Sequence, residues 1–144
     1  MDNTISSPEQ DFMSFGVFLV LDLQGEKAFD ADALCKTLHD STAVRNYVEN
    51  SLDCRFSLEF EHQRHRAEAY MPANDRRYIV VNGEEEAVLQ FATELQLSSD
   101  APIHIVDREC TFDIVVSSVT SLPDFLAKIE ANLGLQNILA ARKD

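Results

Sequence analysis

Cysteine is scarce in this 144-residue chain, and the spacing of its three cysteines excludes two common kinds of stabilising site. Cys35, Cys54 and Cys110 are odd in number, lie far apart and form no CxxC pair. A disulfide framework needs paired cysteines and a structural zinc site needs closely spaced ligands, so neither is expected. Unpaired thiols fit a reducing compartment, and the sequence therefore predicts a cytoplasmic location.

Glycine is also scarce, which removes the usual phosphate-binding loops. The four glycines stand at positions 16, 25, 83 and 134, so neither GxGxxG nor GxxxxGK[ST] can be written. The GxSxG, HExxH and EF-hand patterns are missing as well. We therefore predict no cofactor and no metal and name no catalytic residue. An enzyme with a dispersed active site stays open as a less favoured reading.

Long apolar runs are absent too. The longest, FGVFLVL, is far shorter than the ~20 residues that cross a bilayer, so no membrane-spanning segment is predicted. The start, MDNTISSPEQD, carries acids where a signal peptide needs positive charge. We interpret residues 1–13 as a flexible N-terminal arm, residues 14–134 as a single domain and residues 135–144 as a C-terminal tail.

Basic residues are few, and this shortage is the most informative property of the chain. It has 12 lysines and arginines against 25 acidic residues, a formal net charge of −13. Residues 55–77 hold five arginines and four acids, whereas the segments before and after them carry −7 each. An acidic surface repels nucleic acids and anionic membranes and attracts basic partners. We therefore expect a protein partner with a basic surface, and neither nucleic acid nor membrane.

Hydrophobic periodicity predicts an α+β fold. Strands are expected within residues 14–25, 54–61, 67–71, 78–83, 101–107 and 110–118, and helices within residues 29–40, 40–52, 83–97 and 121–134. The segment 40–52 is interpreted as a new helix or as the continuation of the first. This order predicts an antiparallel or mixed sheet with helices on one face. Its core would be a ferredoxin-like split βαβ, extended by an extra strand and a C-terminal helix.

The same patterns predict which side chains form the core. The expected core residues are Val17, Leu19, Leu21, Leu34, Leu38, Val48, Phe56, Leu58, Phe60, Val80, Val88, Phe91, Leu95, Ile105, Ile114, Val116, Phe125 and Ile129.

The stretch EFEHQRHRAEAY, residues 59–70, gathers two histidines and two arginines within five positions. The apolar alternation shifts phase after Phe60, which predicts a hairpin with its turn near residues 63–65. On a strand, the spacing of His62 and His65 sends them to opposite faces, which disfavours a metal site. Four arginines could bind an anion, but neighbouring acids are expected to neutralise them: Arg64, Arg66, Arg76 and Arg77.

Acidic residues at two predicted helix starts are the candidate partner-binding residues: Asp30, Asp32, Glu84, Glu85 and Glu86. Such residues stabilise the positive end of a helix and remain available for contact. We predict a small acidic interaction protein of the inhibitor, immunity or adaptor type. The alternative is a small-molecule-sensing regulatory module of the ferredoxin-like type, which rests on fold analogy alone. The sequence leaves a homodimer open.

Overall fold

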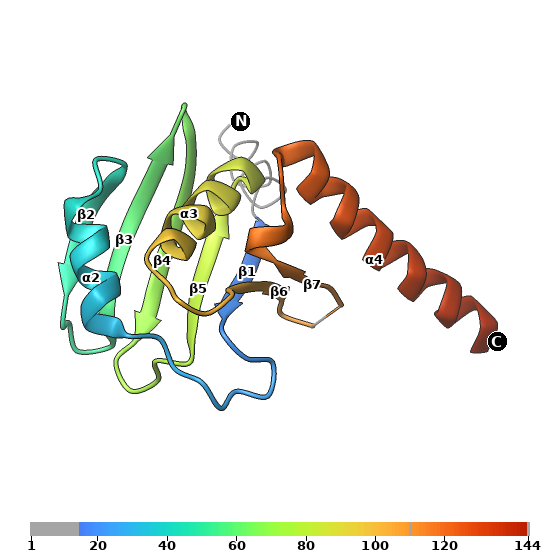
Figure 1. Ribbon diagram of the computed structural model, residues 1–144, viewed down its shortest axis with the longest axis horizontal. Coiled ribbons are helices and arrows are strands. Elements are labelled where there is room, and N and C mark those ends of the chain that lie inside the picture. Colours follow the sequence, from blue (N-terminus) through green and yellow to red (C-terminus); the bar gives the residue numbers. More distant parts are fainter. Residues whose placement is uncertain (1–14, 110, 144) are drawn as a thin grey trace, which may run out of the picture.

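The computed structural model describes residues 15–109 and 111–143, with side chains up to residue 132 (Figure 1). The predicted N-terminal arm, residues 1–13, lies outside the described residues. Within these residues the helices are α2 (Ala31–Asp40), α3 (Glu85–Leu97) and α4 (Leu122–Lys143), with a short 3-10 turn, η1 (Val116–Ser118). The strands are β1 (Phe15–Val20), β2 (Val44–Glu49), β3 (Cys54–His62), β4 (His65–Pro72), β5 (Tyr78–Gly83), β6 (His104–Asp107) and β7 (Asp113–Val115).

The seven strands form one sheet in the order β2-β3-β4-β5-β1-β6-β7. Every neighbouring pair is antiparallel, so the predicted α+β class is confirmed. Three strands separate β1 from β2, although α2 connects them directly along the chain. This order is unusual for a ferredoxin-like sheet, and the split βαβ core is not confirmed.

Helices α2 and α3 lie on the same side of the sheet (Figure 1). We call this side the covered face and the other side the open face. Phe91 of α3 is fully buried on the covered face and meets the ring of Phe60 edge to face at 5.4 Å. Within the predicted core, only Leu21, Val48 and Ile129 are not fully buried. Leu21 and Ile129 still pack against the core cluster.

Residues 44–49 form strand β2 instead of the predicted helix, and a β-bulge explains the error. The pairing with β3 shifts between Arg45 and Val48, so that two residues of β2 stand opposite one of β3. The extra residue brings Val44 and Tyr47 to the covered face at a spacing of three, which imitates a helical period. Val48 consequently lies on the open face, 48% exposed, and was wrongly expected in the core.

The predicted hairpin between β3 and β4 is confirmed, with a two-residue turn. Gln63 and Arg64 have φ values of 51° and 74°, as a type I′ turn requires at both central positions. His62 pairs directly with His65 across this turn, so the two side chains share one face of the sheet. The prediction that they occupy opposite faces was wrong, because it did not count the reversal of the chain.

The last helix begins where the sequence predicts and extends further than expected. The hydroxyl of Ser121 accepts the N–H of Asp124 at 3.2 Å, as an N-cap does. The helix then passes through Gly134 to Lys143 and projects from the domain (Figure 1). One glycine costs a helix interior only about 1 kcal/mol, which good helix formers on both sides can offset. In the described part of the chain, no helix is long and apolar enough to cross a membrane.

Candidate functional site

One histidine and two glutamates tie the β3–β4 hairpin to the start of α3. Nδ1 of His65 lies 2.9 Å from Oε1 of Glu84, and Nε2 of the same ring lies 3.2 Å from Oε1 of Glu86. The backbone N–H of Arg66 donates to the other oxygen of Glu84 at 3.1 Å. We call His65, Glu84 and Glu86 the His65 clasp.

The clasp favours a charged histidine. The hydrogen bond with Glu84 raises the pKa of His65, and the nearby charge of Glu86 acts in the same direction. The same hydrogen bond, together with the Arg66 N–H, lowers the pKa of Glu84. An imidazolium that donates from both nitrogens to carboxylates accounts for both shifts. Two of the three predicted glutamates are therefore engaged within the molecule and half-buried, whereas Glu85 is exposed.

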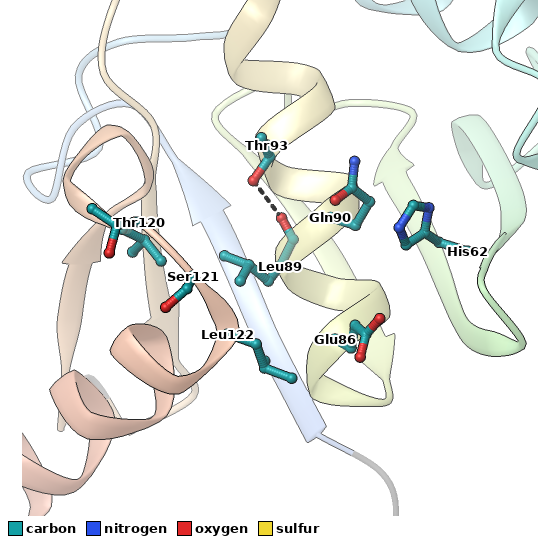
Figure 2. A pocket seen from close by; sticks show the side chains of 9 residues that line it. His62, Glu86, Leu89, Gln90, Thr93, Thr120, Ser121 and Leu122 are labelled. Atoms are coloured by element: carbon teal, nitrogen blue, oxygen red, sulfur yellow. Dashed lines mark hydrogen bonds between the residues drawn. The ribbon is translucent and has the colours of Figure 1, made fainter.

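A groove of about 360 Å³ lies beside the clasp, between α3, the end of β3 and the start of α4 (Figure 2). His62 borders it on one side and Thr120, Ser121 and Leu122 on the other. The side chains that α3 contributes share one helix face at spacings of three and four: Glu86, Leu89, Gln90 and Thr93. The groove has one imidazole, of His62, and one carboxylate, of Glu86. Within the described residues no hydrogen bond joins the two, so they do not form an acid–base pair.

The acids at the start of α2 behave as the sequence predicts for a helix start. Asp30 is the N-cap, and its Oδ1 accepts the N–H of Ala33 at 3.2 Å. The side chain of Asp32 is 88% exposed and lies 2.7 Å from Nη2 of Arg55 on β3. Arg55 thus offsets part of the negative charge at this helix start.

The two sets of predicted acids do not form one surface. Helices α2 and α3 run in opposite directions over the sheet, and their first turns lie at opposite ends of it (Figure 1). The structure brings Glu84 and Glu86 together through His65, and it places Asp30 near Asp32. It does not bring the α2 acids to the α3 acids.

The arginines near the hairpin are partly neutralised, as expected. Arg77 lies 2.8 Å from Asp75, and its hydrogen bonds lower the pKa of that carboxyl to about 2. Arg66 lies 3.7 Å from Glu61, which Arg45 also contacts at 3.1 Å. Within the described residues, Arg64 and Arg76 form no ion pair, so two of the four arginines are neutralised as expected and two are not.

No metal centre or buried carboxylate pair emerges from the part of the chain that the structure describes. In that part, no group of three His, Cys, Asp or Glu side chains could hold a metal ion. Asp113 is exposed on its strand, and its Oδ1 lies 2.7 Å from Nδ1 of His104.

Sequence reasoning missed a second groove, on the open face. It has a volume of about 300 Å³ and is lined by Asn46, Ser57, Glu59, Glu68, Tyr70 and Asn82. The signal for it was present: a turn centred on residues 63 and 64 pairs position 59 with position 68. Two glutamates at directly opposed positions of a hairpin are unusual, because like charges there repel.

The chain was compared with protein-family models, with curated proteins and with solved structures, and no match was found in any of the three.

Proposed function

We propose that this protein is a small acidic interaction protein, of the inhibitor, immunity or adaptor type, that binds a basic surface on a protein partner. The surface position of its charge is the observation that supports this function. No polar or charged side chain is buried in the described part of the chain. Residues 15–132 hold 21 acidic and 10 basic residues, so an excess of 11 negative charges faces solvent. The electrostatic field of this excess charge accelerates the approach of a basic partner.

The acids at the two helix starts contribute to this attraction in different ways. Asp32 and Glu85 are exposed and can meet a partner without breaking the fold. Asp30 caps α2, and Glu84 and Glu86 belong to the His65 clasp, so their replacement also affects stability. The proposed steering residues that can be tested cleanly are therefore Asp32 and Glu85.

The experiment starts by capturing partners from an extract of the native cell on the immobilised protein and identifying them by mass spectrometry. A basic protein recovered in stoichiometric amount is the expected result. Its association rate should then be measured at two ionic strengths, with the wild type and with the charge-reversal variant Asp32→Lys/Glu85→Lys. The reversal should slow association, and the deficit should shrink as salt screens the field.

The variant Arg64→Ala/Arg66→Ala serves as the control, because it removes two charges of the opposite sign from the hairpin. Its association should not be slower than that of the wild type. A captured partner that is acidic, or an association rate that ignores both salt and charge reversal, would refute the proposed function.

A second candidate function is the binding of a small molecule in the groove beside the His65 clasp. Its volume of about 360 Å³ falls within the range of ligand pockets. The ferredoxin-like analogy that first suggested a sensing module loses weight, because the strand order is unusual for that fold. A metabolite that copurifies with the protein would favour this candidate. For either function we propose a cytoplasmic setting, on the basis of the unpaired cysteines.

A further inference from the structure

An apolar belt crosses the open face of the sheet, and no described helix covers it. Phe18 of β1 and Tyr78 of β5 meet edge to face at 5.5 Å. Val80 and Val106 are only 5% and 4% exposed, yet they are not part of the core cluster under the helices. Phe18 stands directly opposite both valines in the sheet, between Val80 on β5 and Val106 on β6. Tyr70 of β4 borders the belt and is 40% exposed.

The belt leads into the open-face groove, where two carboxylates face each other. Glu59 and Glu68 are directly opposed in the β3–β4 register, which places their Cβ atoms about 4.5–5.5 Å apart. Among the described residues, no basic side chain forms an ion pair with either of them. The arginines on this end of the face, Arg45 and Arg66, both contact Glu61 instead. Arg45 also stands directly opposite Glu59 in the β2–β3 register and offsets part of its charge. Three glutamates and two arginines share this end of the face, which leaves one negative charge in excess: Glu59, Glu61 and Glu68 against Arg45 and Arg66.

Two backbone features add amide side chains to the groove. Asn46 lies in the bulge of β2 with a φ of 54°, a left-handed conformation that asparagine tolerates. Asn82 occupies the space above Gly16, where a Cβ atom would lie 2.5 Å from its Oδ1. Arg108 also approaches Gly16, which lies on β1, two strands away from Glu68 on β4. The groove thus combines carboxylates, amides and the Tyr70 ring, all able to receive a cation.

We propose that the open face is the docking surface for the basic protein partner, and that the groove between Glu59 and Glu68 receives an arginine side chain of that partner. This inference rests on the proposed function and deepens it by naming the surface. A guanidinium donates to two carboxylates through a planar fork and stacks on an aromatic ring, which a lysine does less well. The adjoining belt supplies the apolar contact that gives a complex its lifetime.

Charge argues against a second copy of this chain as the occupant. Pairing two open faces would bring two Glu59–Glu68 pairs together on molecules that each carry −13. A basic partner relieves the repulsion within the groove, whereas a second copy doubles it.

The test uses nuclear magnetic resonance of the full-length ¹⁵N-labelled protein with two defined probes. One is the acetylated and amidated peptide Leu-Arg-Leu-Arg-Leu, and the other replaces both arginines with glutamine. The arginine peptide should shift the backbone resonances of Glu59, Glu68, Tyr70 and Asn82, and the glutamine peptide should not. In Glu59→Gln/Glu68→Gln the affinity for the arginine peptide should fall roughly three- to tenfold. The comparison variant Asp32→Asn/Glu85→Gln removes the same number of charges at the proposed steering residues, so it should lower affinity through the long-range field alone and by less than the groove variant.

The outcomes separate this inference from the proposed function. Shifts at the starts of α2 and α3, with binding lost only in Asp32→Asn/Glu85→Gln, would overturn the open-face site and leave an acidic binding protein in place. Equal binding of both peptides, independent of salt, would count against both proposals. A concentration-dependent dimer with shifts across the open face would identify a second copy as occupant and overturn the inference. So would contacts between residues 1–14 and the Tyr70 or Tyr78 ring in the free protein.

Discussion

The two faces of strand β5 both carry apolar side chains and yet have different surroundings. Ile79 and Val81 point into the covered face and are fully buried among the residues packed under α3. Val80, between them, is 5% exposed but lies on the face that no described helix covers. Its neighbours on that face include Phe18, directly opposite it on β1, and Tyr78, two positions before it on β5.

This difference corrects a common reading of apolar strands. A continuous run such as YIVV is taken to indicate a strand covered on both faces. Here the runs belong to β5 and β1, which occupy the middle of the seven-stranded order, where side chains are flanked on both sides. An uninterrupted apolar run can therefore mark a central strand with one open face, and that face is then available for a partner.

The largest effect is expected on the covered face. Replacing Phe91 with alanine should cost about 3–5 kcal/mol, because a fully buried ring leaves a cavity between α3 and the sheet. Urea unfolding measures the loss. Leu97→Ala on the same helix is the control, since Leu97 is 85% exposed and its change should stay within about 0.5 kcal/mol. Equal stabilities for the two variants would mean that α3 does not anchor the covered face.

The most direct comparison of the faces uses two adjacent valines of β5. Val81→Ala should destabilise the protein by about 2 kcal/mol, which combines lost burial with a closed cavity. Val80→Ala should cost about 1 kcal/mol or less, because the space it leaves opens toward solvent and the rings beside it can relax. Because the residue type, the strand and the substitution are identical, the difference in unfolding free energy between the two variants measures the effect of the face on which each valine lies. If Val80→Ala costs as much as Val81→Ala, the free protein has its open face covered.

Much of the covered face could be predicted from sequence, because its signals are local. Alternating residues in β3 identify the inward positions, and Asp30 and Ser121 mark helix starts that the structure confirms. The prediction of a helix in place of strand β2 was wrong because it, too, depended on local signals. Its bulge gives Val44 and Tyr47 a spacing of three, and no nearby residue distinguishes that pattern from a helix.

The candidate sites were harder to predict from the sequence, because they depend on pairing between positions that are distant in the chain. Glu84 was read as a simple helix-start acid, but its carboxylate meets His65, 19 positions away in the chain. Recognising Glu59 and Glu68 as a groove required the hairpin register, the bulge at Asn46 and the absence of a described helix on that side. Sequence periodicity supplies only the first of these.

The His65 clasp stabilises the hairpin on the covered side, and its contribution should depend on pH. His65 has a pKa raised above its ordinary value of 6.5, so its stabilisation is complete below 6.5 and is lost as pH rises through the folded-state value. Glu84 has a pKa lowered below 4.5, so its stabilisation is present above 4.5 and is lost as pH falls through its folded-state value. The clasp should therefore add most stability between about pH 4.5 and 6.5.

The measurement is urea unfolding of the wild type and of His65→Gln at pH 5.5 and pH 8.5. The difference in the free energy of unfolding between the two proteins should be larger at pH 5.5 than at pH 8.5. The double variant Glu84→Gln/Glu86→Gln removes the partners of His65. In that background, adding His65→Gln should change the free energy of unfolding by the same amount at both pH values. A difference that stays constant between the two pH values would show that the clasp does not form in solution. A modest effect is expected, because solvent reaches all three side chains.

The smallest expected effect is a change in stability on the open face, where a substitution should stabilise the protein rather than destabilise it. Replacing Glu68 with glutamine removes one of two like charges that stand directly opposite each other, and it should raise stability by about 0.2–0.5 kcal/mol. Glu61→Gln, on the same strand as Glu59, is the matched control. It should lower stability slightly or leave it unchanged, because Glu61 contacts Arg45 and Arg66. Precise denaturant unfolding of both variants at low ionic strength, where repulsion is least screened, decides between them. A gain in stability that accompanies weaker binding of the arginine peptide is the signature of a surface kept for function at a cost in stability. A loss of stability in Glu68→Gln would instead show that the groove is already neutralised by the chain itself, and the open face would then have no unbalanced charge to offer a partner.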